Sequence, residues 1–151
     1  MKTSVYEHRW SIEDKQDPDP KSVLATIQRT KFVPKPKFSS ALKGELLVAL
    51  QQQGWSSEVE IDAASNISIT SVKNESALCF QTGNMARMYA DLMKLQTVFA
   101  KKVVARGVFI IPTKLCADVL GSNIANFERL SRELTIFDLV ITMPLLVIGI
   151  E

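Results

Sequence analysis

Two continuous apolar runs constrain the fold of this chain more than any other feature. They occupy residues 106–112 and 145–150, and each follows a segment with helical periodicity. An apolar run of this length between helices is typical of a strand that is buried on both faces of a sheet. Strands that are separated by a helix pair in parallel through right-handed crossovers. The two runs therefore predict strands inside a mixed sheet that carries helices on its faces.

The remaining segments complete an α/β pattern. Alternation of apolar and polar residues predicts strands over residues 58–61, 67–72 and 77–81. Apolar residues at helical spacing predict helices over residues 22–30, 40–53, 84–102, 113–120 and 123–134. Residues 5–10 predict an edge strand, and the acidic, proline-containing residues 13–20 predict a loop. We expect one domain over residues 1–151, with a loop-rich N-terminal part around residues 11–38.

Charge and cysteine content exclude few classes of function. The formal net charge is +2, which neither establishes nor excludes nucleic-acid binding. Cys79 and Cys116 lie in apolar segments, which predicts buried free thiols rather than a disulfide framework. No stretch approaches the ~18 apolar residues of a membrane span, and the first residues lack the pattern of a secretory signal. We therefore expect a cytoplasmic protein with no membrane partner.

Three long runs in the second half of the chain resemble a nuclease family. They are LCFQTGNMARMYADL over residues 78–92, GSNIANFER over residues 121–129 and LVIGIE over residues 146–151. Together with the upstream helix that ends at Gly54 and Trp55, they are similar to the BglII-type branch of the type II restriction endonucleases, within the PD-(D/E)xK nuclease superfamily. The resemblance implies a restriction-endonuclease-like fold, with a mixed central sheet and helices on both faces.

The resemblance also implies where an active site would lie. Such nucleases hold a divalent metal ion with carboxylates, and the ion activates water against a phosphodiester. The family places one aspartate on the first strand of a hairpin, and on the second strand an acid two residues before Lys, Glu or Gln. Here Gln81 matches the glutamine, but Cys79 and Thr70 stand at the two acidic positions. Glu45 matches a further acid on the upstream helix, so the remnant catalytic site is Glu45 and Gln81.

The two substitutions predict impaired catalysis. A thiol and a neutral hydroxyl are poor ligands for Mg²⁺, so we expect no metal site and no cofactor. Relocated acids are the alternative, and the candidates are Glu60, Asp62 and Glu75. In that case the chain would be an active, Mg²⁺-dependent endonuclease. A nucleophilic pair of Cys79 with the only histidine, His8, is a further alternative to a small buried Cys79.

Polar side chains near the expected site are candidate DNA contacts. They are Lys73, Asn84, Arg87, Asn123 and Asn126. Structural alternatives remain open for several of them. Asn84 has the side chain of a helix N-cap, Arg87 has Asp91 four residues later for an ion pair, and the two later asparagines suit a cap and a surface amide.

Further cations either line one face of a DNA cleft or stay solvated. They are Lys31, Lys35, Lys37, Lys43, Lys94, Lys101, Lys102 and Arg106.

Three functions follow, of which the first two differ in class. The first is a restriction-endonuclease-like protein that binds duplex DNA as a homodimer, with impaired hydrolysis, since a two-fold pair matches a palindromic site. The second is a nuclease scaffold reused as a protein-interaction, immunity or regulatory factor, which the small net charge suits. The active endonuclease with relocated ligands is the third.

Overall fold

The computed structural model describes residues 1–36 and 39–151. In these residues the central sheet has five strands in the order β1-β7-β6-β5-β4. Its inner strands β5 (Ser76–Phe80), β6 (Arg106–Pro112) and β7 (Leu145–Ile150) are parallel. The two apolar runs are therefore inner strands, as the sequence predicts.

Antiparallel strands close both edges of this sheet. β1 (Thr3–His8) pairs with β7, and β4 (Ser71–Lys73) pairs with β5. Backbone hydrogen bonds of 3.2 and 3.1 Å also join Lys2 to Glu151, so the two described ends of the chain lie side by side. The predicted mixed sheet with an N-terminal edge strand is confirmed.

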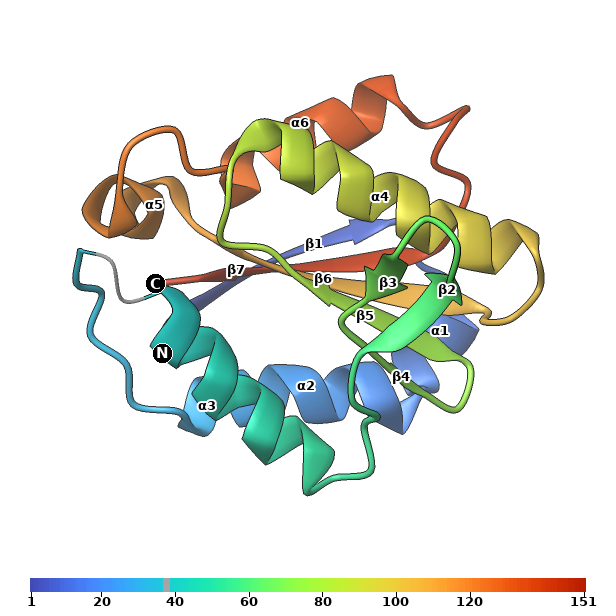
Figure 1. Cartoon of the computed structure of the whole chain (residues 1–151), viewed down its shortest axis with the longest axis horizontal. Helices are drawn as coiled ribbons and strands as arrows, with labels where there is room; N and C mark the ends of the chain where they lie inside the picture. The colour runs from blue at the N-terminus through green and yellow to red at the C-terminus, as the bar shows by residue number, and fades with distance from the viewer. Residues whose placement is uncertain (37–38) are drawn as a thin grey trace.

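Helices cover both faces of the sheet (Figure 1). α4 (Met85–Ala100) and α6 (Phe127–Ile136) lie on one face, and α2 (Pro18–Arg29) and α3 (Ser39–Gln51) lie on the other. The short α5 (Lys114–Leu120) follows β6. None of the helices in the described residues is long and apolar enough to cross a membrane.

Alternate residues of the inner strands fill two separate cores. On β5, Ala77 and Cys79 pack with the α4 side chains Met88 and Leu92, in the first core. Their neighbours Leu78 and Phe80 pack against α2 and α3, in the second core. A strand that is buried on both faces explains why the sequence of these strands is continuously apolar.

Residues 67–72 do not form the single strand that their alternation predicts. The structure breaks them at Thr70 into β3 (Ile67–Ile69) and β4. β3 pairs with β2 (Val59–Asp62) in a separate two-stranded sheet, while β4 joins the central sheet. At the break the Phe80 N–H donates to Thr70 Oγ1 over 3.2 Å, so a side chain replaces a backbone partner. Alternation continues through the bend, which is why it could not reveal the break.

The loop predicted over residues 13–20 is wrong, and so is much of the loop-rich part around residues 11–38. α1 (Ile12–Gln16) begins with a capping box in which Ser11 and Asp14 bond each other's backbone N–H. α2 begins at Pro18, behind the N-cap Asp17, rather than at Ser22. Both prolines fall in the first turn of α2, where a missing N–H costs no helical hydrogen bond. Proline content alone therefore gave the wrong prediction.

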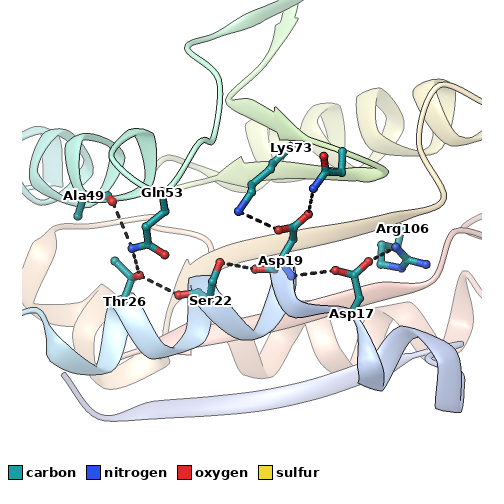
Figure 2. A network of polar contacts seen from close by, with 9 residues as sticks. Asp17, Asp19, Ser22, Thr26, Ala49, Gln53, Lys73 and Arg106 are labelled. Carbon is teal, nitrogen blue, oxygen red and sulfur yellow. Dashed lines mark hydrogen bonds and ion pairs between the residues drawn. The ribbon is translucent and has the colours of Figure 1, made fainter.

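Buried ion pairs attach this N-terminal segment to the sheet (Figure 2). Arg106, at the start of β6, bonds Asp14 at 2.8 Å and also Asp17. Burial opposes ionisation of Asp14, but hydrogen bonds from Arg106 and Ser11 hold the pKa of its carboxyl below the ordinary value.

The next residues of α2 bind the edge of the sheet in the same way. Asp19, which is almost fully buried, contacts Lys73 Nζ at 2.9 Å and Asn74 Nδ2 at 2.7 Å (Figure 2). Two of the predicted cations, Lys73 and Arg106, thus serve the packing of α1 and α2 onto the sheet.

The helix predicted over residues 123–134 begins later than expected. α6 starts at Phe127, and its N-cap is Asn126, whose side chain accepts the Arg129 N–H. Asn123 lies before the helix with a φ of 60°, in the left-handed region that asparagine tolerates. The Ala125 N–H donates to the Gly83 carbonyl over 2.8 Å, so this turn lies beside the start of α4.

Candidate functional site

A polar cavity of about 510 Å³ lies where α3, β3, β5 and α4 meet. Thr70 and Gln81 line it, and so do the N-terminal turns of α4. Its charged lining residues are Lys43, Glu58, Arg87, Asp91 and Lys94. The structure therefore brings Thr70, Gln81 and Arg87 together at one cavity.

Gln81 is held from two sides at the floor of this cavity. Its Nε2 donates to Asp91 Oδ2 over 2.5 Å, and its Oε1 accepts the Gly83 N–H at 2.6 Å. The second oxygen of Asp91 contacts Lys94 Nζ at 2.9 Å. Asp91 therefore pairs with Lys94, and the predicted ion pair of Asp91 with Arg87 is not formed.

Cys79 and Thr70 contribute no negative charge to the site. The Cys79 side chain is 1% exposed and lies in the core under α4, two residues before Gln81 on the same face of β5. Burial raises the pKa of its thiol to about 12, and the nearby charge of Asp91 adds to this effect. Thr70 is half-buried, and its hydroxyl accepts the Phe80 N–H.

The acids expected from the sequence lie elsewhere. Glu45 is exposed on α3, outside the row of Lys43, Leu47 and Gln51 that faces the cavity among the described residues. Glu60, Asp62 and Glu75 are likewise exposed, and none of them lines the described cavity.

Two carboxylates that sequence reasoning missed do line it. Asp91 follows Arg87 by four residues and precedes Lys94 by three, so helical spacing places all three on one face of α4. That spacing was the available signal. Glu58 precedes β2 and accepts a hydrogen bond from the Ser68 hydroxyl. No local pattern points from Glu58 to a site, because only the β2–β3 pairing brings it there.

Most of the sequence matches a known family. A model of the family "Restriction endonuclease BglII/BglIII" matches residues 18–150. The chain belongs to the BglII restriction endonuclease family. Among curated proteins, no sequence matches it.

Solved structures of BglII share the fold of this BglII family member. The crystal structure of restriction endonuclease BglII complexed with a DNA 16-mer has a TM-score of 0.87 at 11% identity. It covers 100% of this chain, which in turn covers 78% of that one. Free BglII has a TM-score of 0.75 at 13% identity, and the match covers 100% of this chain and 80% of that one. The predicted restriction-endonuclease-like fold is confirmed.

The donor set of the cavity does not fit the Mg²⁺ ion of a nuclease of this type. Hard cations select several carboxylate oxygens. Within the described residues, no group of three or more His, Cys, Asp and Glu side chains is arranged to hold a metal ion. The best-placed acid, Asp91, already bonds an ammonium group and an amide.

The residues predicted to contact DNA in this BglII family member do not all lie at the cavity. Arg87 lines the cavity, whereas Lys73 is bound to Asp19 of α2 and does not line it. Asn84 and Asn126 are the N-caps of α4 and α6, which confirms the structural alternative for both. Asn123 is exposed in the turn before α6.

The predicted cation cluster does not converge as a whole. Lys43 and Lys94 line the cavity with Arg87, while Arg106 is paired with Asp14. Lys31, Lys35, Lys101 and Lys102 are exposed and do not line it, and Lys37 lies outside the described residues.

Both thiols are expected to resist chemical modification in the folded protein. Cys79 and Cys116 are each 1% exposed, and burial raises the pKa of Cys116 to about 11. His8 does not activate Cys79, because its Nε2 lies 2.6 Å from the Ile141 carbonyl oxygen and β7 and β6 separate β1 from β5. A thiol reagent at neutral pH should label the chain only after denaturation. Labelling of Cys79 in the folded protein as fast as a fully solvent-exposed thiol would contradict this placement.

Proposed function

We propose that this chain is a restriction-endonuclease-type DNA-binding protein with impaired hydrolysis. One observation carries the proposal. The positions that supply the two central metal-binding acids in the family hold Thr70 and a buried, uncharged Cys79. Without those acids, the cavity lacks the ligands that would concentrate a divalent cation at a phosphodiester.

The loss of the metal ion removes the main source of catalysis. Metal ions in such sites lower the pKa of water and neutralise charge that develops on phosphate oxygens. Asp91 and Glu58 do not replace the missing pair, because Asp91 already bonds Gln81 and Lys94, and Glu58 already accepts the Ser68 hydroxyl. Glu45, the acid first assigned to the remnant site, faces away from the cavity.

Binding of duplex DNA remains compatible with the same cavity. BglII itself is known in complex with a DNA 16-mer. The side chains of Lys43 and Arg87 line the cavity, and neither has an ion-pair partner within the described residues. Free cations of this kind bind phosphate oxygens by releasing condensed counterions. We further propose a homodimer, whose two-fold axis would match a palindromic site.

A parallel binding and cleavage assay tests this function. We expect duplex DNA to bind with an affinity that falls steeply with salt concentration, and plasmid DNA to stay uncut with Mg²⁺ or Mn²⁺. Nicking that is lost in Asp91→Asn or Glu45→Ala would instead show an active endonuclease with relocated ligands. Lys114→Ala, which removes an exposed cation paired with Asp118 outside the cavity, is the control variant.

An interaction protein is the second candidate function. Ile136, Leu139 and Val140 are 71%, 88% and 58% exposed, and they lie close together in the sequence at the end of α6. Clustered exposed apolar side chains are typical of protein-binding surfaces. Absence of DNA binding, together with a stable complex that Leu139→Ser disrupts, would favour this function.

A further inference from the structure

The cavity contains a fixed ammonium group close to the position of a lost metal ligand. Lys94 Nζ contacts Asp91 Oδ1 at 2.9 Å, and the side chains of the two residues are only 28% and 14% exposed. Asp91 is fixed in turn by the 2.5 Å hydrogen bond from Gln81. Lys94 is therefore more restrained than a lysine on an open helix surface.

This ammonium belongs to the part of α4 that lines the cavity, next to the end of β5. Cys79 packs in the core under α4, and Gln81, which directly follows β5, bonds the acid that holds Lys94. The electrostatic effects of Asp91, Lys94 and Lys43 all reach the Cys79 thiol. Positive charge is thus present beside the residue that replaced an acid.

The balance of charge in the cavity is positive without any metal ion. Three cations, Lys43, Arg87 and Lys94, face two carboxylates, Glu58 and Asp91. A site built from converging carboxylates repels phosphate until a divalent ion neutralises it. Here that repulsion is weak, since the Lys94 ammonium offsets the charge of Asp91 and the Gln81 amide donates a hydrogen bond to the same carboxylate.

We propose that Lys94 is the resident cation of this cavity, and that its ammonium group, held by Asp91, binds a phosphate oxygen of duplex DNA without a divalent metal ion. Arg87 and Lys43 contact the same or an adjacent phosphate from the N-terminal end of α4 and from α3. This inference rests on the proposed DNA binding and adds its chemistry: phosphodiester recognition by side-chain cations alone.

Fluorescence anisotropy with a labelled mixed-sequence DNA duplex tests the inference. At matched ionic strength, Kd in EDTA should equal Kd in Mg²⁺ within about twofold. Lys94→Met should weaken binding by about tenfold or more. It should also reduce the slope of log K against log salt concentration by about 0.9, the value for one phosphate contact.

A matched control separates a local role from a general change of charge. Lys114→Met removes one cation from the exposed pair with Asp118, outside the cavity, and should leave Kd within about twofold. Thermal unfolding of every variant shows whether it is folded at the assay temperature.

The outcomes distinguish this inference from the proposed function. Binding that requires Mg²⁺ overturns the inference and leaves DNA binding in place. Binding in EDTA that Lys94→Met weakens no more than Lys114→Met also overturns it. No binding under either condition overturns both the inference and the proposed function.

Discussion

Arg106→Ala is expected to lower the free energy of unfolding by about 3–5 kcal/mol. The Arg106 side chain is 12% exposed and bonds two acids, Asp14 and Asp17, whose side chains are 7% and 16% exposed. Removing the guanidinium leaves both carboxylates buried without a counter-charge. The same change removes the two ion pairs that join α1 and the start of α2 to β6, of which Figure 2 shows the one with Asp17.

Urea unfolding with a matched exposed pair measures this effect. Lys114→Ala, whose ion pair with Asp118 is about two-thirds exposed, should cost less than about 1 kcal/mol. The combined variant Asp14→Asn/Asp17→Asn/Arg106→Met should lose less stability than Arg106→Ala, since no unpaired charge remains. A loss below about 1 kcal/mol for Arg106→Ala would show that the N-terminal segment does not depend on these pairs.

Thr70→Asp/Cys79→Glu is expected to make the protein depend on Mg²⁺ for its stability. Restoring both acids places a carboxylate at the buried position 79, near the charge of Asp91. In EDTA the free energy of unfolding should fall by about 3–5 kcal/mol, because two added carboxylates, one of them at a buried position, exceed the single excess positive charge of the cavity lining. Mg²⁺ at about a hundredfold above its Kd should restore about 2.7 kcal/mol by binding only the folded state.

Thermal unfolding in EDTA and in Mg²⁺ reports this dependence directly. The neutral variant Thr70→Asn/Cys79→Gln has similar side-chain volumes and should show no difference between the two conditions, nor should the unmodified chain. Plasmid nicking gained only by the acidic variant would show that the ancestral cleft is still assembled. An acidic variant that unfolds at the same temperature with and without Mg²⁺ would show that positions 70 and 79 cannot hold an ion together.

The residues of the candidate site differ in how far local sequence could place them. The resemblance assigned Thr70 and Gln81 to one hairpin, and the structure places both at one cavity with Arg87, for which the sequence left a DNA contact and an ion pair with Asp91 open. Glu45 was assigned by resemblance alone, and the rotation of α3 directs it to solvent. Asp91 was regarded only as a partner of Arg87, although it bonds Gln81 and Lys94.

The sequence by itself determined the inner strands, most helices and the family. Continuous apolar runs can be buried only between two layers, and helical periodicity selects the layers that cover them. Only the tertiary structure decided which cations face the cavity. Lys73 and Arg106 meet buried acids of the N-terminal segment, whereas Lys94 meets Asp91 beside β5. A charged side chain takes its partner from whatever element packs against it, and residues far apart in sequence supply those partners.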